Sequence, residues 1–144
     1  MEKKTTELNN ELDGLKKTDL SRWLKDRKKE KMTFGQYLQD LCEKYGTNAS
    51  RLSDISGVSR AHLYNVKNDQ KVLSRKKVIQ IGIGLGATKE EIDKLLKYAG
   101  HKELYPRKIW DSIIIYGLNN KLNSYQINEL LLENDEGDLL NAEK

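Results

Sequence analysis

The segment from residue 49 to residue 68, ASRLSDISGVSRAHLYNVKN, constrains the fold of this chain more than any other. Gly57 separates two short stretches in which apolar residues recur at helical spacing, so the segment predicts two helices joined by a tight turn. Glycine suits such a turn because it tolerates a positive φ. The apolar residues expected to hold the two helices together are Leu52, Val58, Leu63 and Val66. This packing would leave one face of the second helix free.

Helix signals continue through the rest of the chain. Pro106 is its single proline, and no stretch is rich in glycine and serine. Capping boxes, in which two side chains satisfy each other's backbone N–H groups, predict helix starts at Thr33–Gln36, Thr88–Glu91 and Asn123–Gln126. Pro106 suits the start of a further helix. An all-α fold is therefore expected.

The segment from Ser74 to Gly86 is ambiguous. Its run VIQIGIG also fits a strand, and Gly82 and Gly84 each weaken a helix by ~1 kcal/mol relative to alanine. We predict a helix, because Ser74 can cap its start, Gly86 can end it, and no partner strand is evident. The two inner glycines would let another helix approach closely.

Length and composition bound the remaining possibilities. The 144 residues suggest one domain with appended helices, and one third of them are charged. No apolar run approaches a membrane span, and the first residues lack the apolar core of a signal peptide. Cys42 is the single cysteine, which leaves neither a disulfide nor a cysteine-based metal cluster. We expect a cytoplasmic protein with no metal and no cofactor.

Charge is unevenly distributed along the chain. Residues 1–31 carry ten basic and seven acidic side chains, residues 32–100 eleven and seven, and residues 101–144 five and eight. The densest basic block comprises Arg60, Lys67, Lys71, Arg75, Lys76 and Lys77, opposed by Asp69 alone. A basic block beside a free helix face favours a polyanionic partner, whereas a charged face that merely contacts solvent is the alternative.

Residues 33–86 resemble the helix-turn-helix domains of the Cro and lambda-repressor (XRE) type. The resemblance rests on Leu52 and Ser53, on the run SGVSR at 56–60, and on Leu63 and Val66, followed by the pattern from Ser74 to Gly86. Ser53 departs mildly from the family, which prefers alanine there. Residues 95–131 resemble a C-terminal extension of small bacterial and mobile-element proteins of this type. The resemblance implies a five-helix core.

Four parts of the chain follow from these patterns. Residues 1–31 would form an N-terminal helical segment, a packing or dimerisation arm. Residues 32–100 would form the helix-turn-helix domain, and residues 101–134 a C-terminal helical hairpin. Residues 135–144 would be an acidic, disordered tail, able to dock on a basic partner or to fold back on the basic face.

The same resemblance implies which residues would contact DNA. The helix at about 60–66 would lie in the major groove, and its base-facing positions are Ser59, Arg60, Ala61, Tyr64 and Asn65. Arginine can bond guanine, asparagine can bond adenine, and alanine can touch a thymine methyl group. Tyr64 could instead contact sugar or phosphate. Expected contacts to the phosphate backbone are Asn48, Ser50, Lys67, Asn68, Lys71 and Arg75.

Two classes of function remain open. The first is a sequence-specific regulator of double-stranded DNA, a repressor acting as a homodimer, because one such helix reads about half a site. The second is a protein-interaction adaptor, antitoxin-like or inhibitory, that binds a partner through its N- or C-terminal helices. RNA binding ranks below both. An enzyme is not expected, because no nucleophile–base pairing is visible, and the two histidines have no zinc-site spacing.

Overall fold

The computed structural model of the chain describes residues 5–14, 16, 19–24, 32–68 and 73–140. Over these ranges the protein is all-α, with helices, turns and no strand. The chain divides into two compact units, residues 1–32 and residues 33–144. None of the helices described is long and apolar enough to cross a membrane.

The N-terminal unit is a small helical pair with little interior. Helix α1 spans Thr5–Asp13 and buries none of its side chains, and a second helical segment covers residues 20–24. The indole Nε1 of Trp23 donates to Glu11 Oε2 at 2.9 Å, which joins the two segments. Leu12, Leu20 and Leu24 each stay about 40% exposed. The expected N-terminal helical segment is therefore present, with its leucines at the surface.

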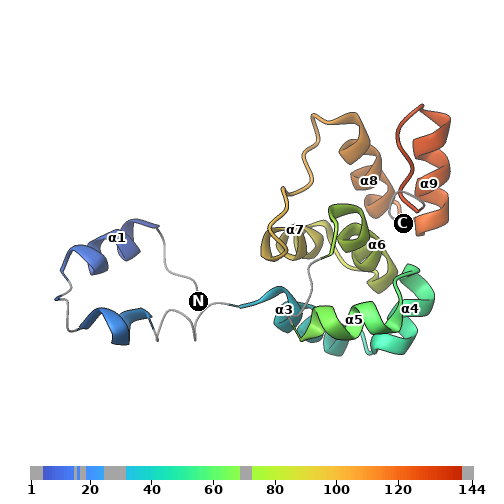
Figure 1. Cartoon of the computed structure of the whole chain (residues 1–144). Coiled ribbons are helices and arrows are strands. Elements are labelled where there is room, and N and C mark those ends of the chain that lie inside the picture. The colour runs from blue at the N-terminus through green and yellow to red at the C-terminus, as the bar shows by residue number, and fades with distance from the viewer. Residues whose placement is uncertain (1–4, 15, 17–18, 25–31, 69–72, 141–144) are drawn as a thin grey trace. The chain divides into compact units, whose positions relative to one another are not determined.

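The second unit contains seven helices within residues 33–68 and 73–140. They are α3 (Phe34–Lys44), α4 (Ala49–Ser56), α5 (Arg60–Lys67), α6 (Arg75–Leu85), α7 (Lys89–Tyr98), α8 (Ile109–Asn119) and α9 (Ser124–Glu133). In Figure 1, α3, α4 and α5 lie at one end, α8 and α9 at the other, and α6 and α7 between them. One hydrophobic core runs through the unit and includes side chains from both sides of residue 100.

Capping residues set the helix ends largely where the sequence predicts them. All three capping boxes form, at the starts of α3, α7 and α9. Ser74 caps α6 and Gly86 ends it in the left-handed region, so the ambiguous segment is a helix, as predicted. The start of α8 was predicted too early: Pro106 lies in a turn, and α8 begins at Ile109 after Lys108, which makes no side-chain cap.

Helix α6 is the centre of the core. Its residues from Val78 to Ile83 are all buried, including the amide of Gln80. A methyl group at Gly82 would lie 2.4 Å from Ile92 Cγ1 of α7, and one at Gly84 would lie 3.1 Å from Ile55 Cγ2 of α4. The glycines thus let α7 and α4 approach α6 closely, as the sequence predicts.

The acidic tail differs from the expectation. Residues 135–140 follow α9 as a turn and an irregular segment that packs back on the unit, and Leu139 is fully buried. The disordered tail expected over 135–144 is therefore wrong for this part, because an apolar side chain and backbone hydrogen bonds hold it. Residues 141–144 lie outside the described ranges.

Candidate nucleic-acid interface

The turn between α4 and α5 is fixed by short-range hydrogen bonds. Gly57 has φ 80° and its N–H donates to Ser53 O, which ends α4. Ser56 Oγ accepts from Val58 N at 3.2 Å, and Ser59 Oγ accepts from His62 N at 3.1 Å, which starts α5. The positive φ expected of Gly57 is confirmed. The turn therefore sets the direction in which α5 leaves α4.

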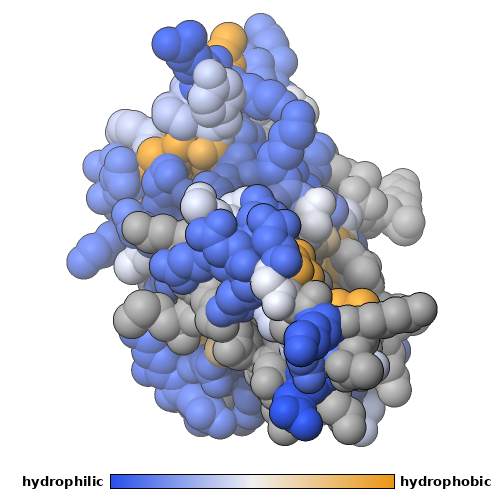
Figure 2. Space-filling model, turned by 90° about the vertical axis from the view of Figure 1, so that its left-hand side faces the viewer, coloured by the Kyte–Doolittle hydropathy of each residue, from blue (hydrophilic) through white to orange (hydrophobic). Residues whose placement is uncertain are grey.

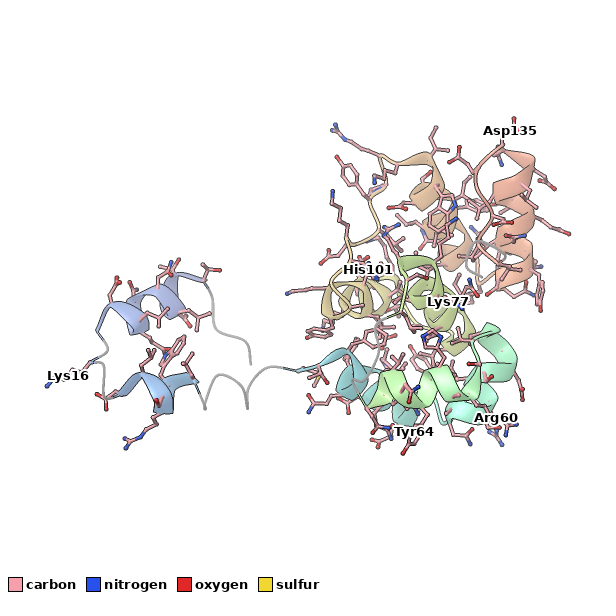
Figure 3. The ribbon with its side chains drawn as sticks, viewed as in Figure 1. Lys16, Arg60, Tyr64, Lys77, His101 and Asp135 are labelled. Carbon is pink, nitrogen blue, oxygen red and sulfur yellow. The ribbon has the colours of Figure 1, made fainter. Side chains whose placement is uncertain are left out.

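Helix α5 has one buried face and one free face. Leu63 and Val66 are fully buried, whereas Tyr64 is 65% exposed. Ser59, Arg60 and Ala61 are exposed as well, and Asn65 is partly exposed. Figure 3 shows Arg60 and Tyr64 at the outer edge of the unit, pointing away from its other helices. The five residues predicted to face bases thus share one accessible surface, which we call the α5 face.

The residues expected to contact phosphate differ in their exposure and in their hydrogen bonds. Asn48 is exposed at the start of α4, where its Oδ1 accepts from Arg51 N at 3.0 Å, and Ser50 is partly exposed beside it. The positive end of the α4 dipole adds to their attraction for an anion. Asn68 Nδ2 donates to Tyr64 O at 3.0 Å at the end of α5. Lys71 lies outside the described residues.

Lys67 stands between the α5 face and the core. It is partly exposed, and it lies close enough to Cys42 to interact with the thiol. Burial raises the pKa of Cys42, and the attraction of Lys67 only partly opposes that rise. Cys42 therefore stays a neutral thiol near neutral pH and places no negative charge beside Lys67.

Arg75 must be removed from the predicted phosphate contacts. Its guanidinium donates to both carboxylate oxygens of Asp111, at 3.0 and 2.8 Å, and Asp111 is almost fully buried. It also donates to the backbone oxygens of Lys102 and Glu103. A bidentate pair of this kind holds the side chain against α8. Arg75 is therefore occupied in joining α6 to the C-terminal helices.

The described residues of the basic block do not gather into a single patch. Lys76 follows Arg75 toward the C-terminal helices, where its Nζ donates to Asp138 O at 2.9 Å and lies 5.6 Å from the centre of the Trp110 ring. In Figure 3, Lys77 on α6 lies apart from Tyr64 on α5. Of the described basic residues in this block, Arg60 and Lys67 lie on α5.

Helix α3 contributes a hollow beside the α5 face that the sequence reasoning missed. Gln39 and Asp40 line it from α3, and Tyr64 and Lys67 line it from α5. The remaining lining residues are Gly35, Gln36 and Asn68. Gln36 was interpreted only as a helix-capping partner, a role it does fill. The usable signal was the spacing of two exposed glutamines three residues apart, which places both on one side of α3.

Within the described residues, no three histidine, cysteine, aspartate or glutamate side chains are grouped so that they could hold a metal ion. His101 bonds the backbone oxygen of Leu73 at 2.7 Å, a structural contact between α6's leading segment and the end of α7. Comparison with protein-family models, with curated proteins and with solved structures finds no match to this chain. Functional assignment therefore rests on the residues themselves.

Proposed function

We propose that this protein is a sequence-specific regulator that binds double-stranded DNA and reads the major groove with the α5 face. The observation that carries the proposal is the pairing of a short, rigid turn at Gly57 with an α5 whose inner face is buried and whose outer face carries Arg60, Ala61, Tyr64 and Asn65. An α-helix fits the major groove, and arginine and asparagine can each make two hydrogen bonds to one base. We propose that it acts as a repressor.

The surroundings of the α5 face suit a phosphate backbone on either side. Asn48 and Ser50 stand at the positive end of α4, and Lys67 and Asn68 stand at the end of α5. The hollow beside α3 also presents the side-chain amide of Gln39 to a phosphate. The carboxylate of Asp40 in the same hollow would repel a phosphate. Contacts of this kind position a protein on DNA, while the base contacts select the sequence.

The test is selection of genomic DNA fragments on the purified chain at near-physiological salt. The double variant Arg60→Ala/Asn65→Ala removes both proposed bidentate contacts. Its matched control is Arg107→Ala/Asn119→Ala, which removes the same residue types from exposed positions in the C-terminal part. Each bidentate pair contributes ~1–3 kcal/mol of base discrimination, so the double variant should lose the site.

We expect a short enriched site for the wild type and for the control, and none for the double variant. The proposal fails if no site is enriched. It also fails if the double variant, shown to be folded by circular dichroism, enriches the same fragments as the wild type.

A protein-interaction role is the second candidate, and exposed apolar side chains favour it. Ile109 and Tyr116 on α8 and Tyr125 and Leu132 on α9 are each more than half exposed. Figure 2 shows hydrophobic surface in the upper part of the view. Under this candidate, substitutions on the α5 face leave binding of the protein partner unchanged, whereas Ile109→Asp abolishes that binding.

A further inference from the structure

The chain after α9 is held as though it were a bound peptide. Residues 136–140, which we call the strap, run back across α9, α6 and α8. Trp110 Nε1 donates to Gly137 O at 2.7 Å, and Lys76 Nζ donates to Asp138 O at 2.9 Å. Gln80 Nε2 donates to Leu139 O at 2.7 Å. Asn128 Oδ1 accepts from Leu139 N at 2.7 Å and from Leu140 N at 3.3 Å.

Four side chains from three helices therefore contact the backbone of the strap. We call Lys76, Gln80, Trp110 and Asn128 the strap site. The side chain of Leu139 is fully buried. Backbone hydrogen bonds combined with a pocket for one side chain are the way in which proteins recognise extended peptides. The site thus recognises the backbone of an extended segment together with a leucine side chain at one position.

The strap site depends on being occupied. Gln80 lies on the side of α6 that faces the core and is only 6% exposed. Its side-chain amide nitrogen donates a hydrogen bond to the strap. A buried donor that loses its partner is costly. A chain whose own strap has left will therefore bind another segment of the same chemistry in preference to leaving the site empty.

The hinge that brings the strap back is short and conformationally unfavourable. Asn134 ends α9, and Asp135 has φ 58°, in the left-handed region that residues with a Cβ seldom adopt, although aspartate does so more readily than most. Glu136 N already donates to Leu131 O at 2.8 Å, so the chain reverses within a few residues. Short hinges under strain favour exchange of the segment that follows them.

We propose that the strap site also accepts the strap of a second copy, so that two chains exchange straps and form a two-fold dimer. Every contact of the strap site can form between chains as it does within one chain, and the opened hinge releases Asp135 from its left-handed conformation. These contacts specify the occupant as an acidic segment with a buried leucine, which each copy carries. The exchange does not depend on the proposed DNA binding, and its test contains no DNA.

The test uses two full-length variants with complementary defects. Leu139→Asp damages the strap and leaves the strap site intact. Gln80→Ala/Asn128→Ala damages the strap site and leaves the strap intact. Each variant alone should be a monomer by sedimentation velocity, and an equimolar mixture should form a one-to-one complex. The control mixture replaces the second variant with a chain that carries all three substitutions, and it should form no complex.

Absence of a complex in the first mixture, with both variants folded by circular dichroism, overturns the proposal, and so does an equal complex in the control mixture. A second measurement applies if either variant fails to fold. The wild type should show a dimer as its concentration rises, and Asp135→Gly, which removes the hinge strain, should lower the association constant several-fold. A wild type that stays monomeric up to millimolar concentration, or a glycine variant that associates equally well, contradicts the exchange.

Discussion

Two glycines on α6 decide how closely its neighbours pack. Gly82 faces α7, where a methyl group would lie within 2.8 Å of two carbons of the Ile92 side chain. Gly84 faces α4, where the nearest atom to such a methyl group is Ile55 Cγ2 at 3.1 Å. The first contact cannot form without movement of a fully buried isoleucine, whereas the second needs only a small shift of a half-exposed one.

The substitution Gly82→Ala should therefore destabilise the protein. Overpacking costs about 1–3 kcal/mol, and the better helix propensity of alanine returns up to ~1 kcal/mol, which leaves a loss of about 1–2 kcal/mol. Gly84→Ala should come close to neutral. Denaturant unfolding followed by circular dichroism measures both. A Gly82→Ala chain as stable as the wild type would show that α6 and α7 are not packed as described.

A cluster around Glu91 joins α7 to α3. Glu91 accepts from Lys44 Nζ at 2.7 Å, from the hydroxyl of Tyr45, and from Thr88 N at 2.9 Å. Burial alone would raise the pKa of Glu91, but these hydrogen bonds outweigh burial and lower the pKa to about 2. Burial and the bond to Glu91 raise the pKa of Tyr45 to about 12. The carboxylate thus acts as the shared acceptor of two helices.

This cluster predicts an acid-dependent loss of stability. Because the pKa of Glu91 is lower in the folded chain than its ordinary 4.5, its contribution is full above that value and is lost as the pH falls toward 2. The contribution is on the order of 3 kcal/mol. The stability difference between the wild type and Glu91→Gln should therefore shrink between pH 5 and pH 2, measured by urea unfolding. For the exposed neighbour, Glu90→Gln, we expect no such trend, and an equal trend in both would contradict the assignment.

At the scale of elements, local signals were readable from the sequence and distant partners were not. Capping side chains act within three residues of themselves, so the starts of α3, α6, α7 and α9 could be predicted. The sequence predicts a phosphate contact at Arg75 because its partner in the fold, Asp111, lies 36 residues further along the chain. The sequence predicts disorder for the strap because acidic residues surround its one buried leucine.

The whole second unit places the α5 face at one end and the strap site toward the other (Figure 1). Helix α6 connects the two, because it packs on α4 and supplies Lys76 and Gln80 to the strap site. Under the proposed function, association away from the α5 face would let two copies place their reading helices in successive major grooves, roughly 34–36 Å apart. The sequence indicated the α5 face through Gly57 and the apolar spacing around it, and it gave no sign of the strap site, whose members come from three separate helices.

Base-by-base affinity measurement tests the reading role of α5 most directly. Duplexes carrying each substitution of the enriched site would be titrated with the wild type, with Arg60→Ala and with Lys67→Ala. We expect Arg60→Ala to lose ~1–3 kcal/mol of discrimination at one or two base pairs. Lys67→Ala should weaken all sequences alike and reduce the slope of log affinity against log salt by ~0.9. If Arg60→Ala instead weakens every duplex equally, α5 contacts only the DNA backbone and does not read its sequence.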